Sequence, residues 1–172
     1  MRDLRRTTSG SVAAALFVLA ASAFIACAGA ETGEYSDSPS AGTESARADS
    51  VAVRDAIVSM FQAGAAAWNR GDLDAFMSDY AVGARTTYIG SSGLLRGPEQ
   101  IRSAYAPRFA PGGNRDSLSF ENIEVDVLAP GVVHAVAYYV LARGDSVTSR
   151  GPTSLILLKT DGTWRIVHDH SS

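Results

Sequence analysis

The spacing of apolar residues differs between the two halves of the region after residue 50, and this difference constrains the fold more than any other feature. Between residues 51 and 107, outside a short segment at 86–96, apolar side chains recur every three or four residues, as in Val53, Ile57 and Phe61, which is typical of amphipathic helices. From residue 119 onward they alternate with polar residues or run together between turn residues, which is typical of strands. The sequence therefore predicts an α+β domain in the order helix, helix, two strands, helix, four strands.

Residues with known capping preferences mark the ends of the expected helices. We expect the first helix to begin at Asp49 or Ser50 as N-cap and to end at Gly71. A short second helix should follow with Asp72 as its N-cap. Its buried side is expected to comprise Leu73, Phe76, Met77 and Tyr80.

The third helix is expected to begin at Gly97-Pro98-Glu99, because proline suits the first helical position, and to end at Pro107. A hairpin should precede it, with strands at 86–89 and 94–96 joined by Gly90-Ser91-Ser92-Gly93. The later strands are expected at 119–127, 132–142, 153–158 and 164–170.

Two of these later strands, 132–142 and 153–158, are apolar on both faces and should lie inside the sheet. In strand 119–127 the apolar side chains of Ile123, Val125 and Val127 alternate with polar ones, so one face should be solvated. Asp161-Gly162 predicts a tight hairpin turn before the last strand.

Residues 1–27 have the layout of a secretory signal peptide, with Arg2, Arg5 and Arg6 before an uncharged run at 11–26. This run is shorter than the roughly 20 apolar residues of a membrane-spanning helix. Cys27, the only cysteine, follows Phe24-Ile25-Ala26, which resembles a bacterial lipoprotein signal whose cysteine is lipidated. The alternative is ordinary cleavage after Ala28 or Ala30. We therefore expect an exported protein, either periplasmic or anchored to a membrane through Cys27, or alternatively secreted.

Residues 28–50 contain five acidic residues and one arginine, and Tyr35 is their only large apolar residue. Such a segment buries too little surface to offset its ordering entropy, so we expect a disordered tether. Residues 51–172 have 11 basic and 12 acidic residues, hence a charge of −1. A nearly neutral domain is not the strongly basic surface of a nucleic-acid-binding protein, so we expect no nucleic-acid partner.

Three motifs carry a resemblance to a known family: Trp68–Asp74, Arg96–Ile101 and Asp161–Ser172. They resemble the SnoaL-like branch of the nuclear transport factor 2 superfamily, and more narrowly bacterial domains of unknown function related to the calcium/calmodulin-dependent kinase II association domain. The resemblance spans residues 51–172. It implies a cone, in which a curved, mainly antiparallel sheet wraps around three helices and leaves a pocket at its wide end, and it implies frequent dimerisation through the sheet.

Members of this superfamily include isomerases, cyclases and dehydratases that use a pocket Asp, His or Tyr for proton transfer, and others without known catalysis. In the last strand, Trp164, Ile166, His168 and His170 should share one face, with Asp169 on the other. If the Trp164 face lines the cone, both histidines lie near the pocket and could transfer protons. The alternative is that His168 is a hydrogen-bonded core residue and His170 a rim residue.

His134 shares a strand face with Val136 and Tyr138, and it is either structural or ligand-orienting. Arg85 could pair with a ligand carboxylate or be a solvated residue. The candidate catalytic residues are His168, His134 and Tyr139. The candidate pocket residues are Tyr88, Tyr105, His134, Tyr138, Tyr139, Trp164, His168, His170 and Arg85. No strong ligand cluster or cofactor motif occurs in the sequence, so we expect neither a metal nor a cofactor.

Three functions are compatible with these observations. The first is an exported domain that binds a small, largely apolar molecule in the cone. The second is a cofactor-independent acid–base enzyme of isomerase, dehydratase or cyclase type that uses pocket His and Tyr. The third is an assembly module that mainly forms a homodimer through its sheet.

Overall fold

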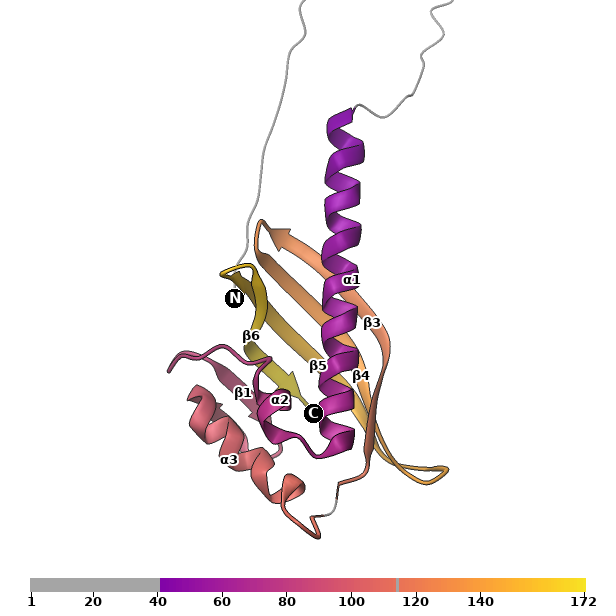
Figure 1. Cartoon of the computed structure of the whole chain (residues 1–172), viewed down its shortest axis with the longest axis vertical. Helices are drawn as coiled ribbons and strands as arrows, with labels where there is room; N and C mark the ends of the chain where they lie inside the picture. Colours follow the sequence, from indigo (N-terminus) through magenta and orange to yellow (C-terminus); the bar gives the residue numbers. More distant parts are fainter. Residues whose placement is uncertain (1–40, 114) are drawn as a thin grey trace, which may run out of the picture. The chain divides into compact units, whose positions relative to one another are not determined.

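The computed structural model describes residues 41–113 and 115–172 (Figure 1). The expected signal peptide, Cys27 and the first part of the expected tether lie outside the described residues. Within the described part, none of the helices has the length and apolar character needed to cross a membrane. The element order is helix, helix, two strands, helix, four strands, as the sequence predicts.

Helix α1 spans Ala41–Arg70 and is longer than the sequence analysis predicts. The expected start at Asp49 or Ser50 is wrong, since residues 41–50 of the expected tether are helical, and the side chains of residues 44–50 are exposed. Once the packed turns around Ile57 have nucleated a helix, further residues add at little cost, even without burial. The helix ends as expected at Gly71, whose φ of +78° suits a glycine at a helix C-terminus.

Helix α2 is short, Leu73–Met77, and the carboxylate of Asp72 caps it by accepting a 2.9 Å hydrogen bond from the Ala75 amide. Helix α3 spans Gly97–Phe109 and has proline in its first turn. The expected end at Pro107 is wrong. Proline removes one donor near the C-terminus, but the last turn still closes through a 3.1 Å bond from the Ala110 amide to the Ala106 carbonyl.

Six strands form one sheet in the order β2-β1-β6-β5-β4-β3. All pairs are antiparallel except β1 with β6. The long central strands β4 and β5 lie inside the sheet, as predicted, and Asp161 and Gly162 make the turn between β5 and β6 with φ values of 51° and 80°. The strands span Thr87–Gly90 (β1), Gly93–Arg96 (β2), Ser117–Ala129 (β3), Val132–Arg143 (β4), Ser146–Thr160 (β5) and Thr163–Ser171 (β6).

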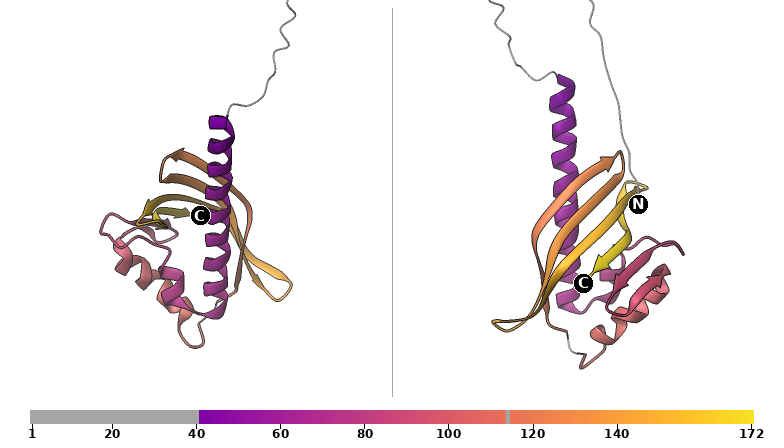
Figure 2. Two further views of the ribbon diagram at one scale, coloured as in Figure 1. Left: turned by 45° about the horizontal axis from the view of Figure 1, so that its top comes forward. Right: turned by 180° about the vertical axis from the view of Figure 1, so that it is seen from behind.

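The curved sheet wraps around α1, and the described helices lie on one side of it (Figures 1 and 2). On this inner side, Ile57 of α1, Val133 and Leu157 are completely buried. The small side chains of Ala135 and Ala137 are also completely buried beneath the helix. We call the two sides of the sheet the inner face, which packs against α1, and the outer face.

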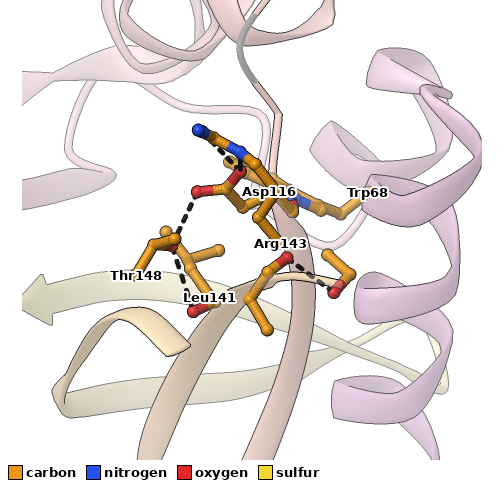
Figure 3. A network of polar contacts seen from close by, with 7 residues as sticks. Trp68, Asp116, Leu141, Arg143 and Thr148 are labelled. Atoms are coloured by element: carbon orange, nitrogen blue, oxygen red, sulfur yellow. Dashed lines mark hydrogen bonds and ion pairs between the residues drawn. The ribbon is translucent and has the colours of Figure 1, made fainter. Parts of the chain in front are cut away.

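A polar network fixes the C-terminal end of α1 to the sheet (Figure 3). The indole of Trp68 donates a 2.8 Å hydrogen bond to the carbonyl of Asp116, just before β3. The Asp116 carboxylate accepts bonds from Arg143 at 2.8 Å and from Thr148 at 2.6 Å. The Thr148 bond and the Arg143 guanidinium hold the pKa of Asp116 below its ordinary value. This network joins α1, β3 and the β4–β5 hairpin beside the wall of the cavity described next.

Candidate functional site

A cavity of about 470 Å³ lies between the helices and the inner face of the sheet. This volume is within the range of sites for small organic molecules. Aromatic residues from α1, α2, α3, three strands and the segment just after α2 make up much of its wall. They are Phe61, Trp68, Phe76, Tyr80, Tyr88, Tyr105, Phe120 and Tyr139.

Edge-to-face packing holds these rings in place. Phe76 contacts Tyr105 with ring centroids 4.9 Å apart and Trp68 at 5.5 Å, while Phe61 contacts Phe120 at 4.8 Å. Each such pair contributes about 0.5–1.5 kcal/mol beyond its buried area. The wall is therefore preformed by contacts among its own residues.

A cluster of polar side chains meets inside this aromatic wall, and we call it the Asp169 cluster: Tyr80, Tyr105, Thr153, Asp169 and Ser171. The Tyr80 hydroxyl donates a 2.6 Å hydrogen bond to Oδ2 of Asp169. Oδ1 accepts from Ser171 at 2.8 Å and from Thr153 at 3.5 Å. The Tyr105 hydroxyl lies 3.5 Å from that of Tyr80. The carboxyl group of Asp169, which is only 4% exposed, thus has hydroxyl donors on both oxygens.

Burial dominates the electrostatics of the Asp169 cluster. It raises the pKa of Asp169, although the bonds from Tyr80 and Ser171 act in the opposite direction. Burial and the nearby Asp169 carboxylate also raise the pKa of both Tyr80 and Tyr105 well above the ordinary tyrosine value. Both phenols therefore remain protonated at neutral pH and can donate hydrogen bonds.

A second carboxyl group, that of Asp79, also borders the cavity. Burial raises its pKa from 3.8 to about 6, and the charge of Arg165 opposes this rise. Gly64 of α1 makes room for it, because a Cβ atom at this position would lie 3.1 Å from Oδ2 of Asp79.

The expected direction of Asp169 is wrong, and a β-bulge explains why. Along β5, Leu157 pairs with Ile166 and the next residue, Ile156, pairs with His168, so Val167 is an extra residue in β6. An extra residue reverses the alternation of side chains beyond it. Asp169 therefore shares the inner face with Ile166, and His168 takes the outer one.

His168 accordingly does not line the cavity. Its Nδ1 lies 2.7 Å from the Thr87 hydroxyl of the neighbouring strand β1. Trp164 remains on the inner face but belongs to the packed core, with the Lys159 ammonium 5.8 Å from its ring, and it is also absent from the cavity wall. The expected pocket positions of these two residues are wrong.

His134 and Tyr138 lie on the outer face, because their neighbours Val133, Ala135 and Ala137 fill the inner one. The Nε2 atom of His134 is 3.0 Å from the Ser154 hydroxyl, and its Nδ1 is 3.9 Å from the Asp126 carboxylate. The Tyr138 ring lies 4.3 Å below the Arg150 guanidinium. Neither residue borders the cavity, contrary to expectation.

Arg85 is exposed in the turn before β1 and also lies away from the cavity. Four expected residues do border it, namely Tyr88, Tyr105, Tyr139 and His170. The Tyr139 hydroxyl donates a 3.1 Å bond to the Ser172 carbonyl at the edge of the wall. No group of three side chains suited to holding a metal ion occurs among residues 41–113 and 115–172.

Sequence reasoning missed the Asp169 cluster almost entirely. Tyr80 was recognisable as a buried residue of the expected second helix, although it lies just after α2, and Tyr105 was recognisable as a cavity candidate. Thr153 and Ser171 carry no sequence signal that distinguishes them from other strand hydroxyls. Asp169 could be found only by knowing that β6 contains a bulge.

Comparisons with known proteins agree with this architecture. A family model described as a SnoaL-like domain matches residues 57–172. No curated protein matches the chain. Among solved structures, an NTF2-like protein of unknown function from Shewanella oneidensis is 30% identical, with a TM-score of 0.63 over 69% of this chain and 97% of that one.

Two further solved structures share the fold at lower identity. An NTF2-like superfamily protein from Salmonella enterica is 19% identical, with a TM-score of 0.58 over 72% of this chain and 92% of that one. A protein from Xanthomonas campestris, assigned as a calcium/calmodulin-dependent protein kinase II association domain, is 18% identical, with a TM-score of 0.55 over 67% of this chain and 84% of that one.

Proposed function

The chain belongs to the SnoaL-like family, and from this premise we propose that its folded domain binds a small, largely apolar molecule in the cavity. One observation carries the proposal: an aromatic-lined cavity of about 470 Å³ contains a group of converging polar side chains, the Asp169 cluster. Apolar walls supply affinity through burial, and a few fixed polar groups orient the ligand. Native mass spectrometry of the purified protein should detect retained ligand, and thermal-shift measurements with a library of apolar compounds should find stabilising ones.

A blocked cavity provides the matched control. Leu141 borders the cavity, whereas Leu158 is on the outer face and 37% exposed. Leu141→Trp should abolish the thermal shift caused by any compound that wild type binds, and Leu158→Trp should preserve it. Equal shifts in both variants would place binding elsewhere and contradict the proposal.

A second candidate function is that of a cofactor-independent acid–base enzyme, of isomerase, dehydratase or cyclase type. Neither His168 nor His134 borders the cavity, so we assign the proton exchange with the substrate to Asp169, which is more deeply buried than Asp79, the other carboxyl group of the wall. The observation that favours it is a buried carboxyl group in an apolar cavity with a raised pKa, since such groups cluster at catalytic sites. Asp169→Asn should then lower kcat for any turned-over substrate by at least 100-fold without loss of folding.

The cellular setting remains part of the proposal. We propose export through the segment at 1–27 and lipidation of Cys27, supported by the charge pattern and the position of this cysteine. Intact-mass analysis of protein from the membrane and soluble fractions tests this directly. A mature chain that begins at Gly29 or Glu31 without an acyl group would refute lipidation.

We also propose that the domain forms a homodimer through the outer face of the sheet. Exposed Tyr138 and Leu158 support this proposal, because the described helices leave this face uncovered. A stable interface needs about 800 Å² from each partner. Light scattering at micromolar concentration should give the mass of two chains, and Tyr138→Glu should shift it to one.

A further inference from the structure

We propose that the ligand of this cavity carries a protonated amine on an apolar body, and that the Asp169 carboxylate accepts the hydrogen bond of the ammonium group. This inference rests on the proposed function, since it requires that the cavity hold a small molecule. It goes further by assigning the charge and the hydrogen-bonding character of that molecule.

The bonding around Asp169 is that of an ionised carboxylate. Tyr80 donates to Oδ2 and Ser171 donates to Oδ1, while the Thr153 hydroxyl lies 2.9 Å from that of Ser171 and 3.5 Å from Oδ1. An ionised carboxylate only accepts hydrogen bonds, whereas a protonated one must find an acceptor for its own proton. A close hydroxyl donor on each oxygen therefore matches the ionised form.

Among the described residues, no cationic side chain forms an ion pair with this carboxylate, although Asp169 is only 4% exposed. Its sequence neighbour His168 points to the outer face and bonds to Thr87. Buried charges in proteins are normally paired, because removal from water is costly. Because folding has already removed water from Asp169, an ammonium group that binds there is attracted by the carboxylate and gives up only its own hydration.

The aromatic wall favours the same charge. Tyr88 and Tyr105 lie with their rings 5.5 Å apart, and Phe76 packs against Tyr105 beside the Asp169 cluster. The faces of such rings attract ammonium groups within about 6 Å. Their edges and methine carbons also provide the apolar surface that an aromatic or alkyl body requires.

The other charged groups of the wall fit an amine better than an acid inside the cavity. Asp79 is a second carboxyl group, and the single arginine of the described wall, Arg108, is an exposed side chain. An anionic ligand group placed near Asp169 would meet like charge in a poorly solvated site. Arg108 allows a neutral or anionic group only at the solvent-exposed end of the ligand.

Three probes that share a phenylalkyl body and differ in their polar end test, on the full chain, whether the ligand carries an amine. They are 4-phenylbutylamine, 4-phenylbutan-1-ol and 4-phenylbutanoate, measured by isothermal titration calorimetry at pH 7. We expect the amine to bind at least ten-fold more tightly than the alcohol, and the acid to bind most weakly. If the alcohol or the acid binds as tightly as the amine, the inference is overturned while the proposed function stands.

Absence of binding by all three probes also overturns the inference, and the Leu141→Trp comparison then decides the proposed function separately. In Asp169→Asn, affinity for the amine should fall at least ten-fold while that for the alcohol changes less than three-fold. Asp126→Asn, on the outer face, should change neither. Because the ranking of the three probes uses wild-type protein, the inference remains falsifiable even if Asp169→Asn fails to fold.

Discussion

Replacing Asp79 by asparagine should stabilise the domain at neutral pH and remove part of its pH dependence. Burial raises the pKa of Asp79 from 3.8 to about 6, so between these values the folded state holds a proton that the unfolded state releases. The stability of the wild type should therefore fall as pH rises from about 4 to 6, and the contribution of Asp79 should be constant above and below that window. This is the opposite of the usual behaviour of an ion-paired aspartate.

The rise from 3.8 to about 6 corresponds to about 3 kcal/mol of unfavourable ionisation at pH 7. The side chain is only partly buried, so solvent screening reduces this value, and we expect a gain of about 1–2 kcal/mol for Asp79→Asn. An asparagine amide fits beside Gly64 as the carboxyl does, and it carries no charge to desolvate.

Urea denaturation at pH 4, 5, 6, 7 and 8 measures the effect. The difference in free energy of unfolding between Asp79→Asn and wild type should be near zero at pH 4 and should grow until about pH 7. Asp145→Asn, in the exposed β4–β5 hairpin, provides a control. Taking the difference also cancels the contribution of Asp169, which is present in both proteins. A pH-independent difference, or a variant less stable than wild type at pH 7, would refute the reasoning.

Three further substitutions test the packing around the cavity. Leu157→Ala should lower the free energy of unfolding by about 2–5 kcal/mol because the side chain is completely buried, whereas Leu158→Ala on the outer face should lower it by less than about 1 kcal/mol. Urea denaturation of both variants measures the difference. Trp68→Phe removes the indole donor to the Asp116 carbonyl and should cost about 1 kcal/mol, and an unchanged denaturation midpoint would show that water replaces this bond fully. Gly71→Ala places a Cβ at a φ of +78° and 2.8 Å from the Arg115 guanidinium, so its melting temperature should fall by several degrees, and an equal or higher value would contradict the role of this glycine.

Local rules predicted those parts of the fold that depend on neighbours in the sequence. Asp72 caps α2, Gly71 ends α1 and Asp161-Gly162 turns between β5 and β6, because each role needs only the conformational preference of that residue. The start of α1 and the end of α3 were predicted wrongly. Both depend on whether a helix already stabilised elsewhere continues through weakly favourable residues, and no single residue decides that.

The candidate site was harder to predict, because it depends on register rather than on composition. The tyrosines at 88, 105 and 139 were expected from their amphipathic character and do border the cavity. His134 and His168 were expected there from their chemistry, yet both occupy the outer face. His134 does so because its more apolar strand neighbours fill the inner face, and His168 does so because of the bulge in β6. The type of a polar residue indicates which chemistry it can perform, but the register of the neighbouring strands determines which face of the sheet it occupies.

Because of the bulge at Val167, strict alternation of side chains along β6 predicts the wrong face for the residues that follow it. Trp164 and Ile166 are two residues apart, as are Asp169 and Ser171, but the two pairs are separated by an odd number of residues. In a regular strand, side chains on one face are separated by even numbers, so the two pairs cannot both face inward. The extra residue allows the apolar pair to complete the core while the polar pair turns into the cavity. β-Bulges are frequent next to functional sites for this reason, since they redirect a side chain without breaking the sheet. The bulge therefore supports the assignment of Asp169, rather than His168, as the polar centre of the cavity.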